Sequence, residues 1–272
     1  MTTPVPSHGV DTIVLIHGLW MTPLSWENWT DRFSSRGYRV IAPSWPGLER
    51  GIDQLRRYPD RIAGVGVTEI VEHYARILQQ LPSAPILMGH CFGGAFVQLL
   101  LDRGLGAAGV AIHSAPVRGV FSLPLSVLKS TLPVLGNPAN VSRAVSLTPA
   151  EFHYAITNTL SEHESAAVYD RYQIPVPGRV LFQVALANLH PRAATRLNFK
   201  RDERAPLLLI AGGADHLTPA VVNRENARRY GSKAVTEFIE FAGRSHYTLG
   251  QPGWEEVADY ALDWAAAHCA SR

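Results

Sequence analysis

Apolar and polar positions follow a repeating order along this chain, in which a strand pattern is succeeded by a helix pattern. Short runs rich in Val, Ile and Leu are followed by longer segments where apolar residues recur every three or four positions. Such alternation is typical of an α/β fold with a mostly parallel sheet between layers of helices. The predicted strands lie within residues 11–18, 38–47, 84–91, 107–116, 205–219 and 234–247. The predicted helices lie within residues 25–37, 67–81, 92–104, 220–231 and 254–269.

The alternation of strand and helix patterns stops between residues 117 and 203, where helical stretches interrupted by proline replace the strand pattern. The alternation of strand and helix then returns. We therefore predict that residues 1–116 and 204–272 form one core domain, and that residues 117–203 are a helical insertion forming a second layer.

Composition and charge narrow the possible partners. Of the 272 residues, 46% are hydrophobic and 18% are charged, which is typical of a globular protein. Lys and Arg number 25 against 23 Asp and Glu, and the basic residues are scattered, so we expect neither nucleic acid nor a membrane as a partner.

The cysteines and the N-terminus bear on the compartment. Cys91 and Cys269 are far apart and do not have the spacing of a disulfide framework or a zinc site. Residues 1–11 lack the basic and apolar regions of a leader peptide, and no apolar run approaches the roughly 20 residues that a membrane helix needs. We expect a cytoplasmic location.

Residues 87–94, LMGHCFGG, join a predicted strand to a predicted helix. Gly89 and Gly93, two positions either side of Cys91, permit a tight turn that holds the central residue in a strained conformation with its side chain presented. Backbone amides and the dipole at the start of the helix favour the thiolate form of a cysteine there. We predict that Cys91 is a nucleophile, with a buried, unreactive cysteine as the alternative. We expect the adjacent His90 to be structural.

Asp215 and His246 follow the last two predicted strands. A sulfur or oxygen nucleophile needs a base within hydrogen-bond reach and a carboxylate that orients this base. Since such groups come from loops at the carboxyl ends of parallel strands, we predict His246 as the base and Asp215 as its carboxylate. We expect His216, beside Asp215, to serve packing or to face solvent.

The residues His17 and Gly18 end the first predicted strand, where a chain reversal can direct a backbone N–H into the site. We predict Leu19 as this donor. The backbone N–H of Phe92, immediately after the nucleophile, is its predicted partner, so that two fixed dipoles stabilise an oxyanion.

Together these motifs resemble those of the α/β-hydrolase superfamily. The likeness covers nearly the whole chain, from IVLIHGLW through MGHCFGG and LLIAGGADHLTP to GRSHYTL. The insertion corresponds to the helical lid that such enzymes carry over the site. The family's first two antiparallel strands are missing, which leaves a mostly parallel sheet of about six strands. The resemblance assigns the family's site residues to Cys91 (nucleophile), Asp215 (acid), His246 (base), and Leu19 with Phe92 (oxyanion donors).

Cysteine at position 91 is a second departure, because similar lidded sequences read GHSxGG. Dienelactone hydrolases carry cysteine there, so a native thiol enzyme and a serine hydrolase with an exchanged nucleophile are both open. The expected reaction is hydrolysis of a carboxylic ester or lactone through an acyl-enzyme on Cys91. The alternatives are an acyltransferase or thioesterase on the same scaffold, and a ligand-binding protein without turnover.

Apolar and aromatic residues near these motifs predict a pocket for a small hydrophobic ester, lactone or amide. The sequence contains no HExxH, no phosphate-binding glycine loop and no clustered metal ligands, so we expect no metal and no cofactor. It does not determine the oligomeric state. The predicted pocket residues are Trp20, Met21, His113, Phe121 and Leu217, with Phe152, Tyr154 and Phe182 from the insertion.

Overall fold

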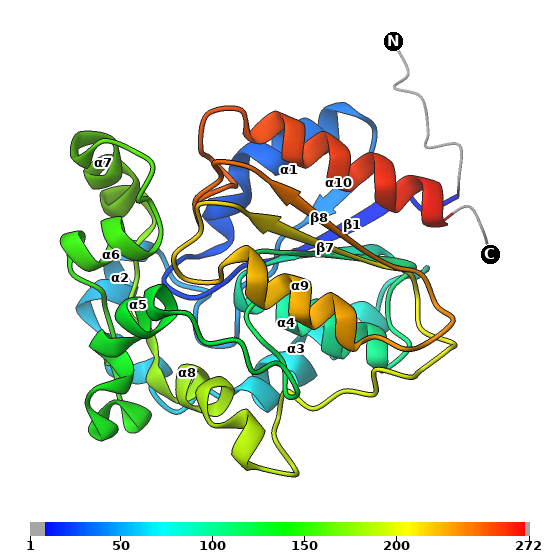
Figure 1. Ribbon diagram of the computed structural model, residues 1–272. Coiled ribbons are helices and arrows are strands. Elements are labelled where there is room, and N and C mark those ends of the chain that lie inside the picture. Colours follow the sequence, from blue (N-terminus) through cyan, green and yellow to red (C-terminus); the bar gives the residue numbers. More distant parts are fainter. Residues whose placement is uncertain (1–8, 270–272) are drawn as a thin grey trace.

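A six-stranded, wholly parallel sheet forms the centre of the molecule in the computed structural model, which describes residues 9–269 (Figure 1). Its order is β2-β1-β3-β4-β7-β8, and each neighbouring pair is parallel. The predicted α/β class and strand number are confirmed. The six strands are β1 (Thr12–Ile16), β2 (Arg39–Ile41), β3 (Ile86–His90), β4 (Ala108–Ile112), β7 (Leu207–Gly212) and β8 (Thr236–Phe241).

Helices cover both faces of this sheet (Figure 1). On one face, α1 and α10 bury Trp29, Phe33 and Leu262 against the sheet. On the other, α3 and α4 contribute Ile70 and Phe96 to a larger apolar core. Both faces are therefore dry, which accounts for the nearly continuous apolar runs of the central strands. These helices are α1 (Glu27–Ser35), α3 (Val67–Gln79), α4 (Phe92–Asp102), α9 (Ala220–Arg229) and α10 (Trp254–Cys269).

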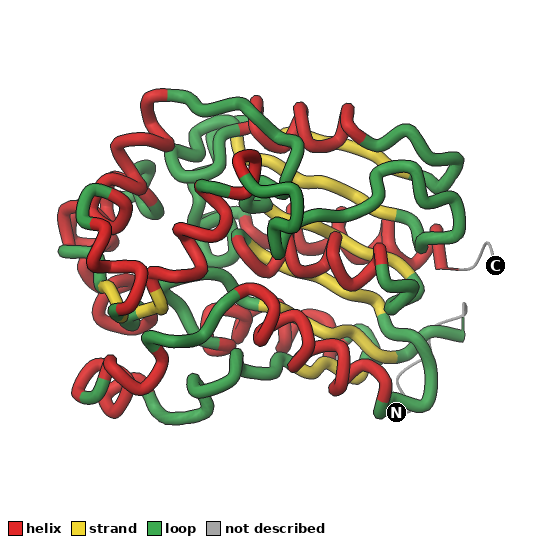
Figure 2. The backbone as a smooth tube through the Cα atoms, turned by 90° about the horizontal axis from the view of Figure 1, so that it is seen from below, coloured by secondary structure: helices red, strands yellow, loops and turns green. Residues whose placement is uncertain are grey.

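Residues 117–203 form a mainly helical layer beyond the carboxyl ends of the strands, as Figures 1 and 2 show. Backbone hydrogen bonds tie it to the core, among them Tyr247 N to Ile156 O and Ile174 N to Trp20 O. Its elements are α5 (Leu125–Leu135), η3 (Pro138–Ser142), β5 (Ala144–Val145), α6 (Pro149–Ala155), α7 (Glu162–Tyr172), β6 (Val176–Pro177), α8 (Gly178–Ala185) and η4 (Ala187–Leu189).

Three details differ from the sequence-based expectation. The segment before Gly66, expected to be irregular, contains the short helix α2 (Ile52–Arg57) and the 3₁₀ turn η2 (Pro59–Ile62), and a further turn, η1 (Pro23–Trp26), precedes α1. The insertion also contains an antiparallel pair, β5 with β6. Elements of two to six residues are too short to show a period of their own.

Membrane-spanning helices are not found between residues 9 and 269. The expectation that no leader peptide is present concerns residues 1–11, of which residues 1–8 lie outside the described residues.

Candidate functional site

Cys91 lies at a sharp turn between β3 and α4, as predicted. Its φ is +58° and its ψ is −120°, a strained conformation for a residue with a side chain. The flanking glycines are required for contact reasons: a Cβ on Gly89 would lie 2.1 Å from the carbonyl oxygen of Gly93, and one on Gly93 would lie 2.0 Å from that of Ile16. The turn thus depends on backbone packing that only glycine permits, and it presents Cys91 at the carboxyl edge of the sheet.

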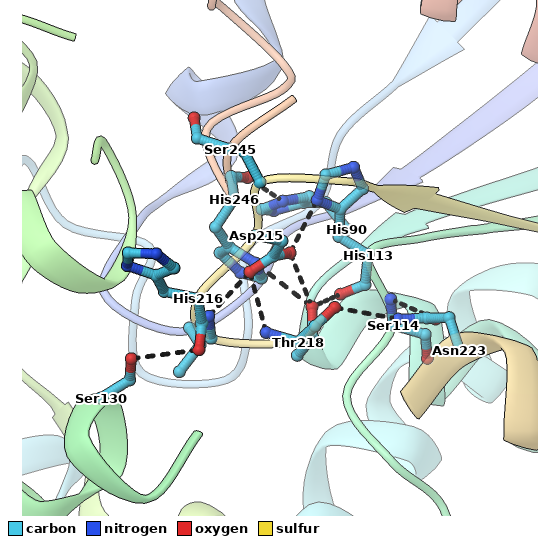
Figure 3. A network of polar contacts seen from close by, with 12 residues as sticks. His90, His113, Ser114, Ser130, Asp215, His216, Thr218, Asn223, Ser245 and His246 are labelled. Carbon is cyan, nitrogen blue, oxygen red and sulfur yellow. Dashed lines mark hydrogen bonds and ion pairs between the residues drawn. The ribbon is translucent and has the colours of Figure 1, made fainter. Parts of the chain in front are cut away.

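Asp215 and His246 meet at the same edge, from the loops that follow β7 and β8 (Figure 3). His246 Nδ1 lies 2.8 Å from Asp215 Oδ2, and both side chains are almost completely buried. Burial lowers the pKa of His246, but the charges of Asp215 and Cys91 and the hydrogen bond to Asp215 outweigh it and raise this pKa to about 10. The charges of Asp215 and Cys91 therefore both stabilise the protonated form of His246, although His246 Nε2 forms no hydrogen bond with the residues that the structure describes.

The Asp215 carboxylate is held by an unusually complete set of donors. Oδ1 accepts the backbone N–H groups of Leu217 at 2.8 Å and Thr218 at 2.9 Å. Oδ2 lies 2.8 Å from His246 Nδ1 and 3.0 Å from the Thr218 hydroxyl, which also lies 2.8 Å from the backbone oxygen of His113 as a second acceptor for its one proton. Burial raises the pKa of Asp215, yet the neighbouring imidazoles and their hydrogen bonds override burial and hold this pKa well below its usual range. The carboxylate is thus ionised and fixed in orientation.

His113 is the residue whose role the sequence reasoning missed. It was predicted to line the pocket, but its Nδ1 lies 2.8 Å from Asp215 Oδ2 and its side chain is completely buried (Figure 3). It follows β4, which pairs with β7, so the strand order places it beside Asp215. Its position after a strand was a usable indication that it belongs to the same edge of the sheet.

The two predicted oxyanion donors flank Cys91. Phe92 is the first residue of α4, where a backbone N–H has no acceptor within the helix. Leu19 follows Gly18, which touches the nucleophile: a Cβ on Gly18 would lie 2.4 Å from Cβ and 3.2 Å from Sγ of Cys91. Leu19 thus adjoins a residue that contacts Cys91, and Phe92 directly follows Cys91. The role of both amides in holding an oxyanion stays a prediction.

A narrow cavity of about 90 Å³ opens onto Cys91 between α5 and α8. Apart from Cys91, its only polar side chains belong to Thr131 and Thr218, so it suits an uncharged, apolar group. Its walls are Cys91, Phe92, Ala115, Pro116, Leu123, Val127, Thr131, Leu135, Leu181, Val184, Ala185, Leu217 and Thr218.

Of the eight residues predicted to line the pocket, only Leu217 lies in this wall. Trp20, Met21 and Phe152 are buried in the core. Phe121 is 63% exposed, with Arg229 over its ring. The remaining three residues have other contacts. His113 forms a hydrogen bond with Asp215, and Tyr154 packs against His216. Phe182 borders a separate hollow.

The other histidines near the site have structural contacts. His90 Nε2 lies 2.8 Å from the backbone oxygen of His246, which agrees with the structural role expected of it. His216 Nδ1 lies 2.9 Å from the backbone oxygen of Tyr154.

One group of side chains in the described part of the chain has the spacing of metal ligands, namely His90, His113 and His246, whose nitrogens lie within 4.8 Å of one another. Nδ1 of both His113 and His246 is directed at Asp215, and His90 Nε2 at a backbone oxygen. A bound ion would have to displace these hydrogen bonds, so the three rings fit the polar network better than a metal centre.

Comparison with known proteins places this geometry in a family. The family model described as the alpha/beta hydrolase family matches residues 13–260. The chain belongs to the alpha/beta hydrolase family. A comparison with curated protein sequences gives no match.

Solved structures share the fold over almost the full length. A monoacylglycerol lipase from Paleococcus ferrophilus has 23% identity and a TM-score of 0.65, with 94% of each chain covered. Polyneuridine aldehyde esterase has 19% identity and a TM-score of 0.66, with 94% of this chain and 99% of the other covered. Tomato methylketone synthase I, solved with 2-tridecanone, has 15% identity and a TM-score of 0.69, with 95% and 99% covered. These α/β hydrolases differ in reaction, so the likeness establishes the fold alone.

Proposed function

We propose that this α/β hydrolase cleaves carboxylic ester or lactone bonds through an acyl-enzyme on Cys91. The observation that carries the proposal is the convergence of a strained Cys91 turn with the buried His246–Asp215 pair at one edge of the sheet. The esterase and lipase among the solved structures support the same reaction class.

The proposed reaction proceeds in two steps. The Cys91 sulfur attacks the carbonyl carbon, and the oxyanion is held by the amides of Leu19 and Phe92. Collapse breaks the ester C–O bond, and the alcohol leaves with a proton from His246. Water, deprotonated by His246, then attacks the thioester, which releases the carboxylic acid and returns a proton to the sulfur. Asp215 keeps the imidazole in the tautomer that both steps need.

The insertion supplies the specificity in this proposal. Residues 117–203 act as a lid, and α5 and α8 provide half of the apolar residues that line the cavity at Cys91. A small hydrophobic acyl or alcohol group fits a cavity with so few polar side chains.

Hydrolysis of a panel of neutral 4-nitrophenyl esters and aryl lactones tests this function. Cys91→Ala and His246→Ala are each expected to lower kcat/KM by at least about a thousandfold. Cys269→Ala, which removes the other buried thiol, is the matched control and is expected to leave the rate unchanged. Equal rates for Cys91→Ala and the wild type would contradict the proposal.

The cysteine itself favours a second reaction, acyl transfer. A thioester is attacked readily by amines relative to water, so an amine that enters the site would compete with hydrolysis. The ratio of amide to acid formed in the presence of an amine should be higher for the wild type than for Cys91→Ser. Equal ratios would remove acyl transfer from consideration.

A further inference from the structure

His113 places a second imidazole on the carboxylate oxygen that orients His246. Its Nδ1 lies 2.8 Å from Asp215 Oδ2, the same distance that separates His246 Nδ1 from this oxygen. The Asp215 and His113 side chains are completely inaccessible to solvent. A carboxylate that orients a catalytic base needs to contact only the imidazole of that base. The contact of Asp215 with a second imidazole, that of His113, is therefore not required for this orientation.

The hydrogen bonds of His113 define its protonation. An ionised carboxylate only accepts, so the proton of a neutral His113 resides on Nδ1. Nε2 is then an acceptor, and it is buried with no partner among residues 9–269. The ring is also confined, because a Cβ on Gly212 would lie 2.4 Å from its Cε1. Within residues 9–269, the polar contact of the His113 side chain is the one with Asp215.

We propose that His113 is a positioning residue, an inference that rests on the proposed function. Its Nδ1–H holds Oδ2 of Asp215 in line with His246 and takes up part of the carboxylate's hydrogen-bonding capacity. A carboxylate oxygen that accepts an additional hydrogen bond is a weaker base. His246 therefore releases its proton more readily than it would beside an unshared carboxylate.

The surrounding groups keep His113 itself neutral. Burial holds the pKa of His113 below its usual value, opposed by Asp215 and reinforced by the charges of His246 and Arg244. The remaining titratable neighbours of the pair are Cys91, which acts on His246, and His90, whose ring centroid is 4.6 Å from that of His246 and 6.0 Å from that of His113. His113 thus acts as a constant donor rather than as a second titrating base.

Two substitutions of similar size separate donation from space filling. His113→Asn keeps an N–H donor at the position of Nδ1, whereas His113→Leu removes it. With ¹³C-labelled histidine, the Cε1 signal of His246 is followed against pH and identified by its loss in His246→Gln. We expect His113→Leu to move the titration midpoint of His246 upward by about half a pH unit or more, and His113→Asn to leave it near the wild-type value.

A purely structural role would lower the stability of both variants without separating their titrations. The positive φ of His113, +47°, adds strain to the leucine variant, but strain alone does not shift a midpoint. Equal midpoints in the two variants, or a downward shift in His113→Leu, would overturn the proposal.

A measurement on the wild type covers the case in which His113→Leu does not fold. The ¹⁵N spectrum of labelled histidine is expected to show the His113 proton on Nδ1, and a proton on Nε2 would overturn the proposal. These readouts do not depend on turnover, so failure of the proposed ester hydrolysis would be seen separately, as unchanged rates for Cys91→Ala.

Discussion

Asp215 is the residue on which the geometry of the site converges. Two imidazoles and two backbone amides donate hydrogen bonds to it, the Thr218 hydroxyl lies 3.0 Å from it, and its side chain is completely buried. A position with these four donors suits an anion that accepts hydrogen bonds on both oxygens. The residue therefore serves both the stability of the fold and the orientation of His246.

Asp215→Asn is expected to lower kcat by about a thousandfold or more. The NH₂ group of the amide would face the groups that donate to Asp215, and it would leave His246 in the wrong tautomer. The free energy of unfolding is expected to fall by about 2 kcal/mol, because a buried donor is left without a partner. Steady-state kinetics and urea unfolding check both effects. Full activity in a folded Asp215→Asn variant would exclude Asp215 as the orienting group.

Sequence reasoning placed Cys91, Asp215 and His246 at one edge, because each follows a predicted strand and the carboxyl ends of parallel strands coincide. It could not assign His113 to Asp215, since this contact depends on β4 pairing with β7 across almost a hundred residues of chain. Such pairing is a property of strand order, which apolar periodicity does not contain.

The turn between β3 and α4 is the element whose packing is least tolerant of change. Gly89→Ala is expected to lower the free energy of unfolding by about 3 kcal/mol and to reduce activity, because the new methyl group meets backbone atoms of Gly93 that have no room to move. Gly64→Ala is the control, since a Cβ there meets nothing within 4 Å. Chemical unfolding of the two variants checks the difference, and equal stabilities would show that the turn can open at little cost.

Helices α5 and α8 each line one part of the cavity, so a substitution in α8 should change the preference for acyl chain length. Val184→Phe is expected to lower kcat/KM for a butyl or longer acyl ester by about tenfold or more while affecting an acetyl ester much less, because filling the cavity removes apolar contact with each methylene. Leu128→Phe, on an exposed position of α5, is the control. A uniform loss over all chain lengths would place the acyl group elsewhere.

The long core helices and strands were predictable from period alone, whereas the cavity walls were not. The packing of the insertion determines which face of α5 or α8 is directed toward Cys91. The helices of the insertion are interrupted by proline, and their apolar residues show only a weak helical period. Aromatic residues such as Phe121 and Tyr154 were therefore predicted as pocket walls on composition. The structure places aliphatic residues there, including Leu135, Leu181 and Val184.

At the scale of the whole molecule, buried histidines link stability to pH. His17 is completely buried against Trp45, and burial, opposed by backbone hydrogen bonds to Gly18 and Met21, lowers its pKa to about 4. Burial likewise holds the pKa of His90 well below its usual value. The unfolded chain binds protons at these sites near pH 6.5, so stability is complete above that pH and is lost as the pH falls toward 4.

His246 has the opposite sign. Its pKa in the folded protein is about 10, so the stability it contributes is complete below pH 6.5 and is lost as the pH rises toward 10. Stability is therefore expected to be highest near neutral pH. Urea unfolding between pH 4.5 and 9.5 checks this. His17 is expected to account for a loss of about 2 kcal/mol in the free energy of unfolding between pH 7 and pH 4.5, and His17→Gln is expected to show a shallower acid slope. A wild-type profile that is flat on the acid side would contradict the neutral, buried state of His17.

The central claim is that the Cys91 sulfur forms a covalent bond with the acyl group during turnover. Intact-protein mass spectrometry after rapid acid quenching, followed by peptide mapping, measures this directly with a slowly deacylated aryl ester. We expect a mass increase of one acyl group on the peptide that contains Cys91. This increase should be present in Cys269→Ala and absent in Cys91→Ala. Two results would contradict covalent bonding of the acyl group to Cys91. One is an acyl group found on another residue during turnover, and the other is turnover without an adduct together with an undiminished rate in Cys91→Ala.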